Sequence, residues 1–181
     1  MLAIQDIAQK IARANPPDGM ITRIVAIDGP GGAGKSTLAS QLSAVLNNAP
    51  IVHTDDFASW DNPLNWWPRL INQVLNPLAM NQETHYQRYD WTLEKLAEWH
   101  RLEPTDYLIL EGVSASRKAF KPYLTYCIWI ETPREERLRR GLERDGEAMR
   151  SQWEQWMRDE DAYIEREHPD ETADVVVSGR S

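Results

Sequence analysis

The chain has 181 residues, of which 41% are hydrophobic and 27% charged, a size and composition typical of one folded domain with a substantial core. Its formal net charge of −8 excludes a broad nucleic-acid-binding surface, because such a surface needs a basic stripe that neutralises phosphates. The single cysteine, Cys127, excludes a disulfide within the chain, and we expect a cytoplasmic protein without a membrane segment.

In chain order, the sequence predicts a surface helix followed by a parallel α/β sheet. Apolar residues at helical spacing indicate a helix over residues 2–14, which ends before Asn15-Pro-Pro-Asp-Gly19. Five short, continuously apolar runs indicate strands that are covered on both faces, as in parallel sheets. A helix over about 34–46 joins the first two strands in a β-α-β unit. The predicted strands are residues 21–27, 51–54, 107–110, 126–130 and 173–177.

The stretch 57–105 is too long for a simple connection, so we expect a substrate-binding insertion there. We predict two helices in it, over about 64–75 and 91–102. It holds five of the eight tryptophans of the chain, which can pack in its own core or wall a substrate pocket. Farther along, helices are predicted over 133–145 and about 147–166, with a lid over about 133–150. The whole chain, 1–181, is expected to form a single domain.

A glycine-rich motif follows the first predicted strand and opens the first helix after it. It has the complete spacing G-x-x-x-x-G-K-[ST] of a phosphate-binding loop. Glycines let the backbone turn tightly and point its N–H groups at phosphate, and the helix start adds a positive dipole end. Lys35 can reach the β- and γ-phosphates of ATP, and the Ser36 hydroxyl can ligate Mg²⁺. The predicted nucleotide-binding residues of this motif are Gly29, Gly31, Gly32, Ala33, Gly34, Lys35, Ser36 and Thr37.

Carboxylates follow two other predicted strands at the sheet edge where the phosphate loop also lies. Asp55 and Asp56 come directly after the second strand, and one of them can accept a hydroxyl proton or help to hold Mg²⁺. Glu111 ends the third strand and can serve the same metal. The alternatives are an aspartate that caps a following turn and a glutamate that faces solvent.

Two further groups of residues are candidates for ligand binding. Arg137, Arg140 and Arg144 share one helix face and suit phosphate oxygens, although a solvated face paired with nearby glutamates has the same pattern. In the insertion, a cation, a carboxylate and two aromatic rings are consecutive and suit a sugar or a base, or else Asp90 caps a helix start. This second group is Arg88, Tyr89, Asp90 and Trp91.

Together, these motifs resemble the uridine kinase-like branch of the P-loop kinases. The resemblance rests on five segments: 29–37, 54–57, 108–112, the pattern Arg137-x-x-Arg140-x-x-x-Arg144-Asp145, and 173–179. It implies a P-loop NTPase three-layer sandwich, with a five-stranded parallel sheet of order 2-3-1-4-5 flanked by helices and an Arg-bearing lid. It also implies that Asp55 is the catalytic carboxylate and that Arg140 and Arg144 close on the phosphates. Ala58, the short lid and the absence of a recognisable pyrimidine-contacting segment depart from the family pattern.

The function that we expect is a kinase that uses ATP and Mg²⁺ to phosphorylate a hydroxyl of a small metabolite. Lys35, Asp55, Arg140 and Arg144 are the predicted catalytic residues, with Arg137 as a further nucleotide ligand. Ser36, Asp55 and Glu111 are the predicted metal ligands, and Asp56 joins the insertion motif in the acceptor site. The expected acceptor is a nucleoside; pantothenate, nicotinamide riboside and a sugar are alternatives. A regulatory nucleotide-binding ATPase without a small-molecule acceptor is the rival from another class.

Overall fold

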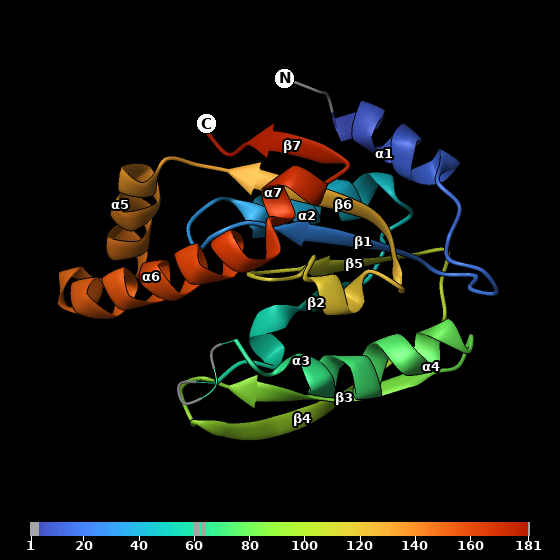
Figure 1. Cartoon of the computed structure of the whole chain (residues 1–181). Coiled ribbons are helices and arrows are strands. Elements are labelled where there is room, and N and C mark those ends of the chain that lie inside the picture. Colours follow the sequence, from blue (N-terminus) through green and yellow to red (C-terminus); the bar gives the residue numbers. More distant parts are fainter. Residues whose placement is uncertain (1–3, 60–61, 63, 181) are drawn as a thin grey trace.

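A five-stranded parallel sheet forms the centre of the computed structural model, which describes residues 4–59, 62 and 64–180. The strand order is β2-β5-β1-β6-β7 (Figure 1), which is 2-3-1-4-5 when the five strands are numbered along the chain, so the predicted fold is confirmed. All four neighbouring pairs are parallel. The strands are β1 (Arg23–Asp28), β2 (Ile51–His53), β5 (Tyr107–Glu111), β6 (Leu124–Glu131) and β7 (Val175–Ser178).

Apolar layers cover both faces of this sheet, as the continuously apolar runs predict. Successive residues of β1 point to opposite faces, so Val25 and Ile27 join one buried cluster while Ile24 and Ala26 join the other. Helices α1 (Ile4–Arg13) and α2 (Lys35–Val45) cover the first face. The second face packs against a helical segment made of α3 (Trp67–Leu70), a π-helical turn (Ile71–Leu75) and α4 (Asn76–Ala79).

The insertion after β2 is partly different from its prediction. The helix expected over 64–75 is present and begins at Trp67, but the helix expected over 91–102 is wrong. The chain instead forms an antiparallel hairpin of β3 (Thr84–Asp90) and β4 (Lys95–Leu102). Asp90 accepts hydrogen bonds from the N–H groups of Thr92 and Leu93, so it caps the hairpin turn and not a helix start.

Two helices follow β6 and include the segment where a lid is predicted. These are α5 (Arg134–Asp145) and α6 (Arg150–Glu167), and Figure 1 shows them beyond the carboxyl ends of β1 and β6. Gly141 of α5 lets Trp153 of α6 pack closely, since a Cβ at position 141 would lie 2.4 Å from the indole ring. The backbone of His168 has a positive φ of 50°, which ends α6 before α7 (Pro169–Thr172).

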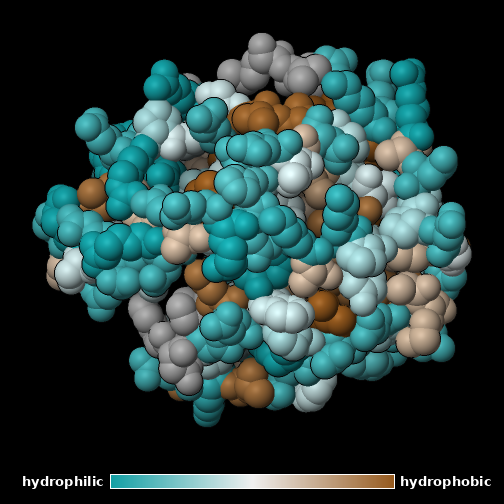
Figure 2. All heavy atoms as spheres, in the orientation of Figure 1, coloured by the Kyte–Doolittle hydropathy of each residue, from teal (hydrophilic) through white to brown (hydrophobic). Residues whose placement is uncertain are grey.

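The surface in Figure 2 is mostly hydrophilic, with small and separate apolar areas. Among the described residues, every helix is too short or too polar to cross a bilayer. Most of the predicted site residues lie together at the carboxyl edge of the sheet.

Candidate active site

The phosphate-binding motif forms a tight loop between β1 and α2, as predicted. Gly32 and Gly34 have φ values of 74° and 101°, in the region that favours glycine. A Cβ at Gly32 would lie 2.7 Å from the carbonyl oxygen of Arg137, so α5 packs directly on the loop backbone. Because α2 begins at Lys35, its free N–H groups and positive dipole end are directed at the loop. The loop can therefore hold a polyphosphate.

Asp28, which the sequence analysis missed, holds the phosphate loop in place through the hydrogen bonds of its carboxylate. It is fully buried at the end of β1. Its carboxylate accepts hydrogen bonds from the N–H groups of Gly29, Ser114 and Ser116 and from the hydroxyl of Tyr163. A single carboxylate thus joins the phosphate loop, the segment after β5 and helix α6. An aspartate that ends a buried strand directly before the first glycine is the sequence signal that could have identified it.

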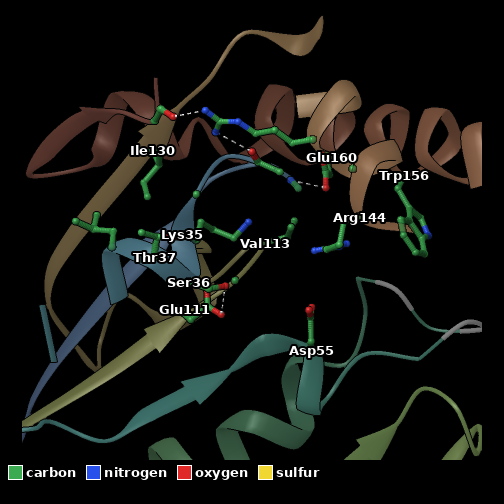
Figure 3. A pocket seen from close by; sticks show the side chains of 18 of the residues that line it. Lys35, Ser36, Thr37, Asp55, Glu111, Val113, Ile130, Arg144, Trp156 and Glu160 are labelled. Atoms are coloured by element: carbon green, nitrogen blue, oxygen red, sulfur yellow. Dashed lines mark hydrogen bonds between the residues drawn. The ribbon is translucent and has the colours of Figure 1, made fainter. Parts of the chain in front are cut away.

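A cavity of about 1490 Å³ opens over this loop (Figure 3). It extends between the phosphate loop, the end of β2, the hairpin turn, α5 and α6. Ligand pockets usually measure about 300–1000 Å³, so this one is large enough for two ligands. The predicted site residues that line it are Gly31, Gly32, Gly34, Lys35, Ser36, Thr37, Asp55, Trp91, Glu111, Arg140 and Arg144.

The two consecutive aspartates after β2 have different surroundings. Asp55 faces the cavity, and Figure 3 shows its carboxylate pointing toward Arg144. It exposes surface to the cavity but is enclosed by protein on its other sides, and this desolvation raises its pKa despite the nearby charge of Lys35. Asp56 instead accepts a hydrogen bond of 3.3 Å from the hydroxyl of Tyr86 in the hairpin. The geometry therefore favours Asp55 as the reacting carboxylate.

Glu111 lies at the end of β5 beside the start of α2 and fits a divalent cation. Its Oε1 accepts a hydrogen bond of 3.2 Å from Ser36 and lies 2.6 Å from Nδ1 of His53. Burial alone would raise the pKa of Glu111, but the hydrogen bond with His53 and the charge of Lys35 outweigh it and lower that pKa. Within the described part of the chain, Oε2 of Glu111 is buried without a hydrogen-bond partner. A buried, ionised and unpartnered oxygen beside a serine hydroxyl suits Mg²⁺.

The same contact perturbs His53, a residue that the sequence analysis did not assign to the site. Its hydrogen bond to Glu111 raises the pKa of the imidazole, which is otherwise half exposed. In the segments that the structure describes, no three His, Cys, Asp or Glu side chains are grouped to hold a metal by themselves.

Three cations surround the phosphate loop on the cavity side. The Nζ of Lys35 donates a 2.9 Å hydrogen bond to the carbonyl of Pro30. Arg140 donates to the carbonyls of Gly32, at 3.3 Å, and Gly179, at 3.0 Å, and so spans from the loop to the end of β7. Arg144 pairs with its neighbour Asp145. Positive charges in these places suit the oxygens of a polyphosphate.

Arg137 has a different place from the one we expected. Its side chain is buried, donates a hydrogen bond to the carbonyl of Thr132, and lies 3.4 Å from Glu160 of α6. Glu160 in turn accepts a 2.9 Å hydrogen bond from the N–H of Gly31 and lines the cavity. Burial raises the pKa of Glu160, although Lys35, the Gly31 N–H and Arg137 oppose this. Arg137 thus supports the phosphate loop indirectly, through Glu160. Glu160 is a further residue of the site, and nothing in the sequence of its helix distinguishes it from the other glutamates there.

In the motif 88–91, three of the four side chains hold the hairpin together. Arg88 pairs with Asp90 and with Glu98 of β4. Tyr89 packs edge-on against Trp91 at 5.4 Å between ring centroids. Trp91 alone of this group lines the cavity, and its indole N–H donates to the backbone carbonyl of Asp55 at 3.0 Å. The hairpin therefore brings an aromatic wall next to Asp55.

Comparisons with known proteins show which proteins this chain resembles. A family model described as an AAA domain matches residues 25–167. The uridine kinases of Borrelia duttonii (strain Ly) and Borrelia turicatae (strain 91E135) are each 26% identical to this chain over 178 residues, with 87% of this chain and 86% of theirs covered. These matches confirm the resemblance to uridine kinase-like P-loop kinases that the motifs indicate.

Solved structures share the fold at low sequence identity. A protein named as a possible uridine kinase from Bacillus stearothermophilus superposes with a TM-score of 0.70 at 22% identity, covering 96% of both chains. A protein provisionally named a fructose transport system kinase from Silicibacter sp. TM1040 superposes with a TM-score of 0.77 at 18% identity, covering 98% of this chain and 100% of the other.

Proposed function

This chain belongs to the AAA domain family of P-loop proteins, and we propose that it is an ATP-dependent kinase that phosphorylates a hydroxyl group of a small metabolite. One observation carries the proposal: the phosphate loop and the Asp55 carboxylate face the same cavity, which is large enough for a donor and an acceptor together. Phosphoryl transfer needs positioning and charge stabilisation more than covalent chemistry, and this cavity has both.

In the proposed reaction, the loop N–H groups and Lys35 hold the β- and γ-phosphates of the donor. Asp55 accepts the proton of the acceptor hydroxyl as its oxygen attacks the γ-phosphorus, and ADP leaves. The raised pKa of Asp55 makes its carboxylate a better base than an ordinary aspartate. Arg144, which Figure 3 shows across from Asp55, offsets the charge that develops on the transferred group, together with Arg140, which precedes it by four residues on α5.

Ser36 and Glu111 would hold Mg²⁺, and we assign Asp55, which was also a predicted metal ligand, to the acceptor hydroxyl. When bound, the ion neutralises charge on the β- and γ-phosphate oxygens. The chain's own part is to keep Glu111 ionised, which the contacts from His53 and Lys35 favour.

We propose a nucleoside as the first acceptor to test, because Trp91 and Trp156 supply aromatic rings to the cavity wall. The names of the two Borrelia relatives support the same choice. A sugar, nicotinamide riboside and pantothenate are the alternatives. A nucleoside can place its base on a ring face and one ribose hydroxyl near Asp55.

The test is ADP release from Mg-ATP by the purified chain, alone and with each acceptor of a panel. The panel contains uridine, cytidine, adenosine, nicotinamide riboside, fructose, ribose and pantothenate. We expect one acceptor class to raise the rate well above the background hydrolysis, and a phosphorylated product to be visible by mass spectrometry. A rate that no acceptor changes would refute the kinase and favour the regulatory ATPase.

A further inference from the structure

His53 and Glu111 are the last residues of two neighbouring parallel strands, β2 and β5. The register of this pair places His53 directly beside Glu111, so both side chains lie on the same face of the sheet. The backbone that follows each strand is held closely, because a Cβ at Gly112 would lie 1.8 Å from Oγ1 of Thr54. The contact between His53 and Glu111 is therefore built into the pairing of the two strands.

The two carboxylate oxygens of Glu111 have different surroundings. Oε1 accepts a hydrogen bond from the Ser36 hydroxyl, which Figure 3 shows on the cavity wall, and lies 2.6 Å from Nδ1 of His53. An ionised carboxylate can only accept, so Nδ1 of His53 carries the hydrogen in this contact. Oε2 has no hydrogen-bond partner among the residues that the structure describes. Glu111 is thus left with one free oxygen.

A carboxylate that offers one oxygen does not suit all divalent cations equally. Each carboxylate oxygen has about two lone pairs, and Ser36 and His53 together occupy both of those on Oε1. Mg²⁺ is small, demands an octahedral shell and takes few carboxylate oxygens, whereas Ca²⁺ takes six to eight oxygens and often both from one carboxylate. The arrangement around Glu111 therefore fits Mg²⁺ better than Ca²⁺.

We propose that His53 is a positioning residue, which holds Oε1 so that Glu111 meets the cation through Oε2 alone and the site favours Mg²⁺ over Ca²⁺. His53 acts through Glu111 and does not itself touch the cation. This inference rests on the proposed function, since it needs a cation that is bound together with a nucleotide. It gives a role to a residue that belongs to none of the motifs in the sequence.

The test measures ADP binding by calorimetry in Mg²⁺, in Ca²⁺ and in EDTA. His53→Leu removes the donor, and His53→Asn keeps an N–H donor close to the position of Nδ1. The matched control is His85→Leu, because His85 also contacts a glutamate, Glu83, but lies on the hairpin outside the cavity lining.

We expect His53→Leu to weaken ADP binding in Mg²⁺ by about tenfold or more, the usual effect of losing a group that orients a metal ligand. The loss in Ca²⁺ should be smaller, because both oxygens of Glu111 can then turn to the larger ion. Affinity in EDTA should not change. His53→Asn should stay within about threefold of the wild type in Mg²⁺, and His85→Leu should behave like the wild type throughout.

Four results would overturn the inference: no loss in His53→Leu, an equal loss in EDTA, an equal loss in Ca²⁺, or an equal loss in His53→Asn. If His53→Leu does not fold, His53→Ala takes its place, because the side chain of His53 is half exposed. A wild type that binds no ADP would refute both this inference and the proposed function. A wild type that binds ADP more tightly in Mg²⁺ but phosphorylates no acceptor would refute the kinase alone.

Discussion

The choice between Asp55 and Asp56 gives the sharpest test of the proposed mechanism. Asp55→Asn keeps the shape of the side chain but removes the base, and general-base catalysis contributes about 10²- to 10⁴-fold. We therefore expect kcat to fall by at least about a hundredfold while ATP affinity stays within a few-fold of the wild type. Asp56→Asn should leave kcat nearly unchanged, because Asp56 is turned toward Tyr86.

The side-chain hydrogen bond between Asp56 and Tyr86 sets an upper limit on how much Asp56→Asn lowers the free energy of unfolding. The bond to the Tyr86 hydroxyl is 3.3 Å long and partly buried, so its loss costs about 0.5–1.5 kcal/mol at most, and asparagine retains an acceptor oxygen. For a chain of this size the melting temperature should drop by no more than about 2–6 °C. The measurements are a coupled ADP-release assay with the best acceptor, ATP calorimetry and a thermal melt. A larger loss of kcat in Asp56→Asn than in Asp55→Asn would refute the assignment.

Three further variants test other parts of the site. Lys35→Ala should abolish turnover in the same assay while its circular dichroism melt stays near that of the wild type; residual turnover above a hundredth would contradict the role of Lys35. Gly141→Ala places a Cβ 2.4 Å from the Trp153 ring and should cost about 1–3 kcal/mol in urea unfolding, whereas an unchanged midpoint would show that the two helices separate easily. Burial raises the pKa of Glu160, so its contribution to stability is present at low pH and is lost as the pH rises through that raised value. The free energy of unfolding of Glu160→Gln should therefore improve relative to the wild type between about pH 4 and pH 8, and a difference that does not vary with pH would contradict this reasoning.

The sheet and the phosphate loop could be predicted from the sequence because their signals are local. Each of the five apolar runs is long enough for a strand, and the loop motif fixes both the strand before it and the helix after it. The strand order came only from the family resemblance, since short apolar runs do not specify their neighbours. The structure then confirmed that order.

The hairpin could not be predicted because its sequence satisfies two periods. Trp91, Lys95 and Trp99 lie four residues apart, which fits a helix face, but the same stretch also fits a strand with one exposed side. Tertiary contacts decide between them: Tyr86 of β3 stacks on both Phe57 and His100, with ring centroids 5.1 Å apart in each case. That stack ties the hairpin to the segment after β2, an arrangement with no signature in the local sequence.

The different positions of three arginines near the loop could not be predicted, for a related reason. Arg137 shares a helix face with Arg140 and Arg144, so spacing alone gives all three the same role. Their different surroundings depend on α6. A carboxylate oxygen of Glu160 lies 3.4 Å from the guanidinium of Arg137, and the ring centroid of Trp153 lies 5.6 Å from the guanidinium carbon of Arg144. Partners that are 9 to 23 residues away cannot be paired by a periodicity argument, so this part of the site needed the structure.

The proposed anion site on a chain with net charge −8 also needs a physical explanation. At physiological ionic strength, charges farther than about 8 Å across solvent are largely screened, so local charges dominate the affinity for phosphate. Lys35, Arg140 and Arg144 line the cavity, and the start of α2 adds its partial positive charge. Several carboxylates near the loop are held by donors of the protein: Asp28 by three backbone N–H groups, Glu160 by the Gly31 N–H and Asp145 by Arg144. Because those donors offset their charge, the cavity can attract polyphosphate while the rest of the surface stays acidic.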